Sequence, residues 1–273
     1  MKTSLAIAAL FLAFLPAAAS ADQLDDVKAK GELVCGTIGT VPIFSFQSPT
    51  DRQTVGYDID ICNAVAAQLK VKPSLKLVSG PARIPELTQN RYDIIVSTLG
   101  WTKERAAQVD YSDVYWVSNQ YVAVRSDSGV GTLAALSGRK LSAQSASTSA
   151  LAAKAALPDS ELLTFEDVPQ SFLAVQQGKT VGIVLSELML ERYRAETAGK
   201  PGAITILREK PLMIEYDGIG VRKGEVRLLQ AVNDALHAIE ASGELDRIFD
   251  RWLGKDSEFK LTRGFKVAPI PQT

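Results

Sequence analysis

The chain has 273 residues, with 30 Lys and Arg against 31 Asp and Glu, so its formal net charge at pH 7 is −1. Such a near-neutral balance gives no support to binding of nucleic acid or of a charged membrane surface. The length allows one large domain, or two domains of ordinary size that each bury their own core.

The first 21 residues are predicted to be a cleavable secretion signal. Met1 and Lys2 precede an apolar run from Leu5 to Leu15, and a small-residue cleavage motif follows at 19–21. The run is shorter than the ~20 residues of a membrane-spanning helix, which favours secretion over a membrane anchor. Cleavage would remove Lys2, the only charged residue of the segment, and change the net charge from −1 to −2. No cysteine of the kind that carries a lipid follows the run, so we expect a lipid-free periplasmic protein.

Helices and strands alternate through the first part of the mature chain. The expected elements are, in order, a helix at 23–30, a strand at 31–36, a helix at 58–69, a strand at 75–78, a helix at 84–89 and a strand at 92–96. Asp58 is expected to cap the second helix, and the loop at 37–47 carries the aromatic side chain of Phe44. The β-α-β-α-β order predicts a parallel sheet covered by helices.

The second part of the chain continues the same alternation. Strands are expected at 120–124, 140–143, 162–165, 181–184, 204–207 and 218–221, and helices at 149–156, 168–177, 186–194, 226–240 and from 243 onward. In the helix at 226–240, Leu229, Val232, Leu236 and Ile239 recur at spacings of three and four residues. This spacing predicts a helix face that packs on a core.

Residues 91–115 contain the leading candidate for a binding site. The strand at 92–96 ends in a polar segment, and Thr102 is expected to cap a helix that carries Arg105 in its first turn. Ligands of open α/β sheets bind at the carboxyl ends of strands, and free N–H groups at a helix start favour an anion. An arginine in the first turn opposes the helix dipole, which suggests that an anion lies nearby. The alternative is a solvated surface arginine.

A second segment of this kind lies at 144–148, where hydroxyl groups follow a strand and precede an alanine-rich helix. Ser147 and Thr148 stand at the expected helix start, where hydroxyls and backbone N–H groups can hold an anion. Ordinary helix capping explains the same residues without a ligand. The segment therefore indicates a binding site only in combination with the first one.

Cys35 and Cys62 are the only two cysteines of the chain. Cys35 lies in the first expected strand, and Cys62 lies on the apolar face of the helix that should pack on the same sheet. In an exported protein this arrangement favours a disulfide, which would stabilise the fold by about 3–4 kcal/mol. The alternative is two buried thiols, because sequence does not give the geometry. No metal site is expected from two cysteines and the single His237.

Several segments match one family pattern in the same order. They are GELV at 31–34, VGYDID at 55–60, RIPEL at 83–87, YDI at 92–94, TKER at 102–105, GVRKG at 220–224, SGE at 242–244 and WLG at 252–254. Together they resemble the family 3 periplasmic solute-binding proteins of amino-acid ABC transporters. The resemblance implies an α/β "Venus flytrap" of the type II periplasmic-binding-protein kind, with two lobes, two hinge strands and a ligand cleft between the lobes. Lobe 1 would hold residues 22–117 and 218–273, and lobe 2 would hold residues 118–217.

The resemblance also assigns roles to individual residues. Arg105 matches the arginine that clamps the α-carboxylate of the ligand, a role that suits the bidentate guanidinium fork. Thr98 and Gly100 match positions that add donors to that carboxylate, and Ser147 and Thr148 match the residues of lobe 2 that close over it. Two further candidate contacts come from the same pattern. They are Phe44 in the first loop and Arg83, which in relatives that bind glutamate or aspartate meets the side-chain carboxylate. The alternative for Arg83 is a surface arginine near the start of a helix.

The chain departs from the family pattern where the ligand ammonium and side chain would be recognised. Ile38 and Val41 replace the acidic and aromatic residues of the first loop, and Gly80 replaces a second aromatic residue. The aspartate that usually pairs with the ammonium aligns with Ser186, which Glu187 follows. Glu187 could turn toward the ligand, hydroxyls and carbonyls could hold the amine, or the ligand could lack an α-amine. Trp101 could supply a cation–π face instead, or pack against the hinge.

These residues are compatible with three functions. The preferred one is a non-catalytic, monomeric binding protein that captures an amino acid, with acidic ones among the candidates. It would deliver the amino acid to permease subunits in the inner membrane and would need no cofactor. The second is a periplasmic lyase of the same fold, similar to cyclohexadienyl dehydratase, with Glu187 as the general acid. The third is a ligand-sensing partner of a receptor.

Overall fold

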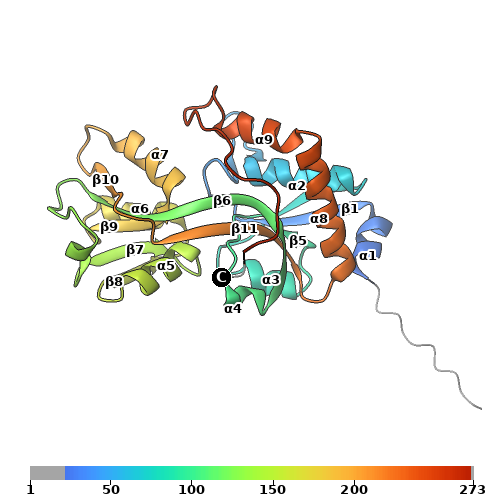
Figure 1. The fold of residues 1–273 in the computed structure, drawn as a ribbon, viewed down its shortest axis with the longest axis horizontal. Helices are drawn as coiled ribbons and strands as arrows, with labels where there is room; N and C mark the ends of the chain where they lie inside the picture. The colour runs from blue at the N-terminus through green and yellow to red at the C-terminus, as the bar shows by residue number, and fades with distance from the viewer. Residues whose placement is uncertain (1–21, 272–273) are drawn as a thin grey trace, which may run out of the picture.

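The computed structural model describes residues 22–271, so the predicted secretion signal at 1–21 lies outside the described residues. Two long antiparallel strands, β6 (Val109–Arg125) and β11 (Met213–Arg222), run across the whole molecule and join its two lobes (Figure 1). Lobe 1 contains the elements before β6 and after β11, and lobe 2 contains the elements between them. No helix among residues 22–271 is long and apolar enough to cross a membrane.

Lobe 1 contains the parallel sheet that the sequence predicts. Strand β1 (Glu32–Thr37) lies between β4 (Lys72–Leu77) and β5 (Ile94–Ile95) and is parallel to both. The helices of this lobe are α1 (Gln23–Lys30), α2 (Tyr57–Gln68), α3 (Arg83–Thr88), α4 (Lys103–Ala106), α8 (Val226–Ala241) and α9 (Glu244–Leu253). Helices α2, α8 and α9 cover one side of the sheet, and α3 and α4 lie on the other (Figure 1). A short hairpin of β2 (Phe46–Gln47) and β3 (Thr54–Val55) precedes α2.

Lobe 2 repeats the arrangement on a smaller scale. Strand β7 (Lys140–Gln144) lies between β8 (Glu161–Phe165) and β9 (Gly182–Ser186), and all three strands are parallel. Strands β9 and β10 (Ile204–Leu207) both pair with β6, so one nine-stranded sheet continues through both lobes. A 3-10 turn (Ala134–Leu136) and the helices α5 (Thr148–Ala156), α6 (Val168–Gln176) and α7 (Glu187–Thr197) complete the lobe.

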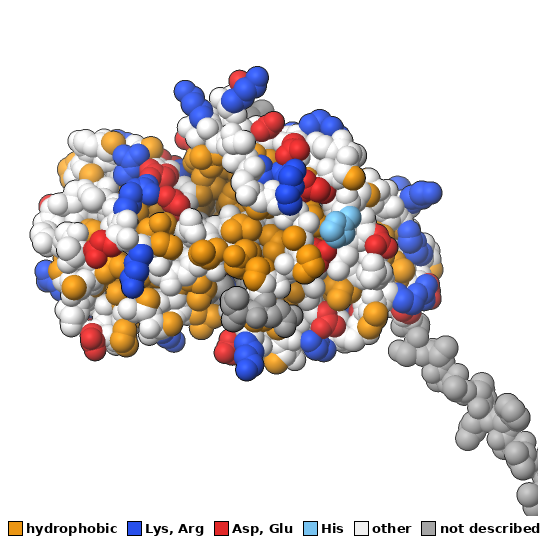
Figure 2. Space-filling view, viewed as in Figure 1, with side chains coloured by type: hydrophobic (Ala, Val, Ile, Leu, Met, Phe, Trp, Pro, Cys, Tyr) orange, Lys and Arg blue, Asp and Glu red, His pale blue; other side chains and the backbone are white. Residues whose placement is uncertain are grey.

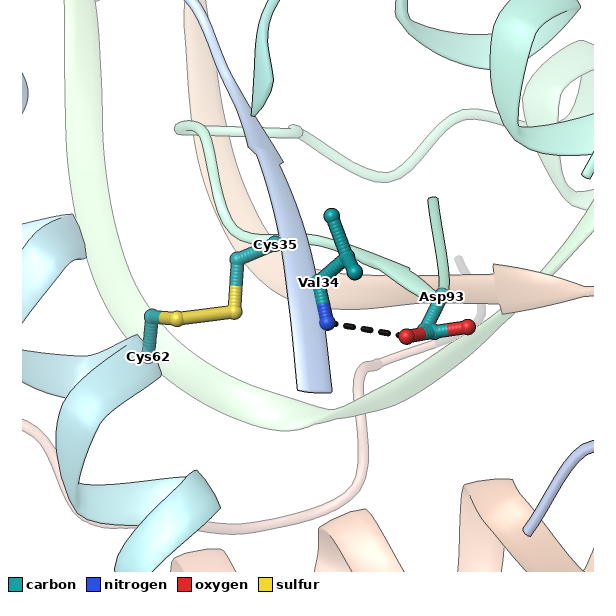
Figure 3. Close-up of a disulfide and its surroundings, with 4 residues drawn as sticks. All are labelled: Val34, Cys35, Cys62 and Asp93. Carbon is teal, nitrogen blue, oxygen red and sulfur yellow. Dashed lines mark hydrogen bonds between the residues drawn. A yellow bond between two sulfur atoms is a disulfide. The ribbon is translucent and has the colours of Figure 1, made fainter. Parts of the chain in front are cut away.

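A disulfide joins Cys35 of β1 to Cys62 of α2, which is the pairing favoured from the sequence (Figure 3). The two Cα atoms are 6.4 Å apart, and both side chains are fully buried. On the other side of β1, the carboxylate of Asp93 accepts a hydrogen bond of 2.8 Å from the backbone N–H of Val34. These contacts hold β1 between α2 and the segment that leads into β5.

The start of α2 differs from the prediction that Asp58 caps this helix. The backbone N–H groups of Tyr57 and Asp58 donate to the carbonyls of Ile43 and Phe44, at 2.8 and 3.0 Å, so the first loop caps the helix. Asp58 is free to point inward, where its Oδ1 accepts a hydrogen bond of 2.9 Å from the hydroxyl of Tyr115. Burial raises the pKa of this carboxyl to about 7. A contact with a distant loop has therefore replaced the expected local cap.

The chain after α9 is fixed to the rest of lobe 1 through Glu240 of α8. Arg263 donates to both carboxylate oxygens of Glu240, at 2.7 and 2.8 Å, and Lys266 donates to Oε1 at 2.9 Å. Beyond these contacts, the ring of Phe265 packs edge-on against Trp116 of β6 with the ring centroids 5.6 Å apart. The C-terminal segment thus packs directly on one of the two strands that join the lobes.

The ion pairs of Glu240 predict an acid-sensitive contribution to stability. Hydrogen bonds from Arg263 lower the pKa of Glu240 to about 2. The pKa is lower in the folded than in the unfolded state, so this contribution is complete above about pH 4.5 and is lost as the pH falls through about 2. We expect Glu240→Gln to lower the free energy of unfolding by about 1–2 kcal/mol near neutral pH. Urea unfolding should show that the difference in free energy of unfolding between wild type and Glu240→Gln becomes smaller toward pH 2. An equal difference near neutral pH and near pH 2 would contradict this prediction.

Candidate ligand-binding site

A cavity of about 60 Å³ lies between the lobes, against β6 and β11. Most of the site residues expected from the sequence line it, namely Phe44, Arg83, Thr98 and Arg105 of lobe 1 and Ser147, Thr148 and Ser186 of lobe 2. Ile38 and Val41, at the positions that depart from the family pattern, line it as well. The fold therefore brings the two segments with helix-start hydroxyls to opposite walls of one cavity.

Arg105 connects the two lobes across this cavity. As predicted, Thr102 caps α4, its hydroxyl oxygen accepting a hydrogen bond of 3.2 Å from the N–H of Arg105. The guanidinium donates from Nη1 to the carbonyl of Gly100 at 2.7 Å and from Nη2 to the carbonyl of Ala146 in lobe 2 at 2.5 Å. Arg105 is buried, so the alternative of a solvated surface arginine is wrong. Helix α4 has only four residues, so its dipole is weak. The side chain of Arg105 is held in place by the two backbone carbonyls.

Arg83 is the second buried cation of the cavity wall. It donates from Nε to the carbonyl of Gly80 at 3.0 Å and from Nη1 to the carbonyls of Ser97 and Thr98, at 2.7 and 3.3 Å. Burial and the nearby charge of Arg105 lower the pKa of Arg83 to about 10, so the side chain stays charged near neutral pH. Within the described residues, its Nη2 makes no hydrogen bond. Arg83 thus shapes the segment after β5 and still has donors that can serve a ligand.

Gly100 lies beside the cavity rather than among its lining residues. Its carbonyl accepts hydrogen bonds from Arg105 and, at 3.1 Å, from the hydroxyl of Tyr111. A Cβ atom at this position would overlap Oε1 of Glu215 and lie 2.7 Å from Cγ2 of Thr148. A glycine here therefore allows β11 and lobe 2 to approach the segment that carries Arg105.

The hydroxyls of lobe 2 have different partners. Ser147 caps α5, its oxygen accepting from the N–H of Ala150 at 3.1 Å, and donates to the carbonyl of Gln144 at 2.7 Å. The hydroxyl of Thr148 donates to the carboxylate of Glu215. Ordinary capping thus accounts for the position of Ser147, whereas Thr148 contacts a charged group across the cavity wall.

The structure places Ser186 at the cavity and Glu187 outside it. The carboxylate of Glu187 pairs with the guanidinium of Arg208 at 2.6 Å, in the wall of a separate groove of about 800 Å³. Hydrophobic side chains gather on this face between the lobes (Figure 2). The ion pair turns Glu187 away from the cavity, so the prediction that it could turn toward a ligand receives no support. Trp101, the other alternative for the amine, is also not among the residues that line the cavity.

Two buried carboxylates of β11, Glu215 and Asp217, line the cavity and were not predicted as site residues. Glu215 accepts hydrogen bonds from Thr148, from the amide of Gln120 and, at 3.3 Å, from the hydroxyl of Ser118. Burial raises the pKa of Glu215, and burial together with the charge of Glu215 raises the pKa of Asp217 well above its usual range. Their spacing of two residues on a strand, which puts both on one face, was the signal that could have revealed them.

No metal-binding cluster accompanies these carboxylates. Residues 22–271 contain no group of three or more His, Cys, Asp and Glu side chains that could hold an ion. His237 lies on the exposed face of α8, where its Nε2 is 2.7 Å from a carboxylate oxygen of Asp113. The chemistry of the cavity is therefore that of guanidinium, carboxylate, hydroxyl and amide groups.

Comparison with known proteins identifies the family. Residues 33–255 match the model of the bacterial extracellular solute-binding proteins, family 3. The ABC transporter glutamine-binding protein of Bacillus subtilis is 29% identical over 239 residues, which are 86% of each chain. The L-cystine-binding protein of Escherichia coli K12 is 26% identical over 85% of this chain and 86% of its own.

Solved structures agree with this result. An ancestral arginine-binding protein bound to arginine superposes with a TM-score of 0.75 at 31% identity, covering 82% of this chain and 99% of its own. An ancestral amino-acid-binding protein described as a precursor of cyclohexadienyl dehydratase gives 0.76 at 29% identity, covering 86% and 100%. The predicted two-lobed α/β fold is thereby confirmed. The chain belongs to the family 3 bacterial extracellular solute-binding proteins.

Proposed function

We propose that this protein captures an amino acid between its lobes and delivers it to the permease subunits of an ABC importer in the inner membrane. The observation that carries the proposal is the position of Arg105, a buried cation in the cavity wall that bonds to both lobes. A ligand carboxylate at this guanidinium would stabilise the closed arrangement of the lobes. Related proteins are named for binding glutamine, cystine or arginine, which supports an amino acid as the ligand.

The ligand α-carboxylate takes the free donors of Arg105. Nη1 and Nη2 each use a single hydrogen bond to a backbone carbonyl, and the guanidinium has five N–H donors in all. Thr98, Ser147 and Thr148 line the same cavity from both lobes, and Gly100 adjoins it, so these residues complete the proposed carboxylate site. Arg83 has donors left on Nη2, which suit a carboxyl or amide oxygen on the ligand side chain.

The lobes close by bending where β6 and β11 cross between them. The proposed boundaries lie at 117/118 and 217/218, and Val117 pairs with Tyr216 at this point. The pairing register shifts between Asp217 and Gly218, which is the kind of irregularity that bends a strand. The protein acts as a monomer in the periplasm, after removal of residues 1–21.

The lyase of the same fold is the competing function, because one structural relative is described as a precursor of a dehydratase. The general acid expected for such a lyase is Glu187, which is held outside the cavity by Arg208. Glu187 therefore gives the lyase no general acid in the cavity, and we propose that the protein binds its ligand and returns it unchanged.

A ligand panel tests this function. The mature chain is unfolded and refolded to remove bound ligand, and its thermal stability is measured with each of the twenty common L-amino acids, with L-cystine and with small dicarboxylates. A ligand at 100 times its Kd should add about 2.7 kcal/mol of stability. We expect at least one α-amino acid to bind, with mass spectrometry recovering it intact after incubation. Binding of none of them, or conversion of the bound compound, would refute the proposal.

A further inference from the structure

Asp217 is a buried carboxylate in the cavity wall that has no partner. Its side chain is 1% exposed, and its Oδ1 is fully buried without a hydrogen bond. Within residues 22–271, neither of its oxygens accepts a hydrogen bond or forms an ion pair. An ionised buried carboxylate without a partner costs several kcal/mol, so a cation that reaches the cavity and pairs with Asp217 would remove this cost.

Glu215 stands two residues earlier on the same face of β11 and lies beside Asp217. Thr148, Gln120 and Ser118 donate hydrogen bonds to it, but among the described residues no arginine or lysine pairs with it. The two carboxylates face the same cavity as Arg83 and Arg105 without forming an ion pair with either. The cavity wall thus carries a cationic part and an anionic part that are adjacent and unpaired.

The anionic part lies immediately beside the carboxylate-binding arginine. Asp217 pairs with Gly100 in a β-bridge, and the carbonyl of Gly100 holds Nη1 of Arg105 at 2.7 Å. The missing side chain of Gly100 leaves the space that Oε1 of Glu215 fills. In an α-amino acid the carboxylate and the ammonium group are attached to one carbon atom. Their binding groups must therefore be neighbours, as Arg105 and the two carboxylates are.

We propose that Asp217 and Glu215 of strand β11 bind the α-ammonium group of the ligand. This inference rests on the proposed function, because it takes the ligand to be an α-amino acid held by Arg105. It supplies an anionic partner for the ammonium group from the hinge strand, although Ser186 stands where the family resemblance leads us to expect an aspartate. Binding of the ammonium group would then act directly on closure of the lobes, because β11 is one of the two strands that are proposed to bend.

Proton release should accompany binding. Burial and the charge of Glu215 raise the pKa of Asp217 well above its usual range, so a proton on this pair competes with the ligand ammonium for the same oxygens. The ligand ammonium displaces that proton, so affinity rises with pH until it passes the pKa of the free pair. The other titratable and charged groups that face Asp217 are Asp58, Arg83, Arg105, Tyr57, Tyr111 and Tyr115.

The test compares isosteric variants with two forms of one ligand. The tightest L-amino acid of the panel and the same acid without its α-amine are titrated into wild type, Asp217→Asn and Glu215→Gln by calorimetry. We expect Asp217→Asn to lower affinity for the amino acid by roughly 30-fold or more, within the range of truncated buried charge pairs. Affinity for the deaminated acid should change by less than about threefold. Asp159→Asn, an exposed carboxylate of lobe 2, is the matched control.

Calorimetry in phosphate and in Tris, which differ in ionisation enthalpy, supplies a second readout. Wild type should release protons on binding, and Asp217→Asn should release fewer under the same conditions. Urea unfolding of the ligand-free variants checks that each one folds. A variant that folds and loses affinity equally for both ligand forms would overturn the inference, as would a loss confined to amino acids with cationic side chains. If wild type binds no amino acid, the proposed function itself has failed.

Discussion

Replacing Arg105 with alanine is expected to weaken amino-acid binding by about 150- to 4,000-fold, because a buried carboxylate left without its charged partner costs about 3–5 kcal/mol. The guanidinium supplies two things at once in this structure. It offers a planar pair of donors to the ligand, and it bonds to the carbonyl of Ala146 in the other lobe. Its loss should therefore reduce both the contact with the ligand and the stability of the closed form.

Arg105→Lys separates charge from shape at this position. Lysine keeps the positive charge but cannot hold Gly100 and Ala146 while it also binds a carboxylate through a planar fork. We expect an intermediate loss of affinity, of about tenfold or more. Arg139→Ala, at an exposed position of lobe 2, should bind like wild type. Isothermal titration calorimetry measures all three variants. Unchanged affinity in Arg105→Ala would show that the ligand carboxylate binds elsewhere.

The sequence predicts the features that depend on neighbouring residues. The alternation of helices and strands, the cap of α4 by Thr102 and the cap of α5 by Ser147 all follow from patterns within a few residues. The cavity could be predicted because the family motifs place Arg105 and Thr148 at corresponding helix starts of the two lobes. These predictions needed no knowledge of which distant segments touch.

The features that the sequence did not predict all depend on contacts between distant segments. Asp58 has the local sequence context of an N-cap residue, but the carbonyls of a loop more than ten residues earlier cap the helix. The side chain of Asp58 is instead buried beside Tyr115. Glu187 follows Ser186 directly, yet the position of Arg208 decides which way its side chain points. The sequence predicts a strand only from Gly218 onward, whereas β11 begins at Met213 and includes Asp217. Its burial arises from pairing with β6.

The charges of the cavity show why a binding site is less stable than a core of the same size. Two buried arginines and two buried carboxylates face one cavity without forming ion pairs. Hydrogen bonds to neutral groups replace part of the hydration that Arg83, Arg105 and Glu215 lose, and Asp217 has no such bond among the described residues. An α-amino acid carries a carboxylate and an ammonium group. Its binding would therefore give a charged partner to the arginines and to the carboxylates of the cavity wall at the same time. Asp217→Asn should accordingly leave the free protein at least as stable as wild type while it weakens binding, a trade-off that is common at functional sites.

Removing the disulfide is expected to cause the largest loss of stability away from the cavity. Cys35 and Cys62 are separated by 27 residues, and closing a loop of this length stabilises the folded state by about 3.5 kcal/mol through the entropy of the unfolded chain. The bridge lies wholly within lobe 1, between β1 and α2. Cys35→Ala/Cys62→Ala should therefore lower the free energy of unfolding by about this amount, as should reduction of the wild-type protein.

The same double variant tests whether stability and binding are separate in this molecule. Neither cysteine lines the cavity, and the ligand contacts lie at the ends of other elements, so affinity at a temperature where the variant is folded should match wild type. Urea unfolding with and without reductant measures the stability change, and titration of the ligand measures affinity. Equal stability with and without the bridge would contradict the entropic argument. A large loss of affinity would mean that the packing of β1 against α2 positions the first loop, with Ile38 and Phe44, at the cavity wall.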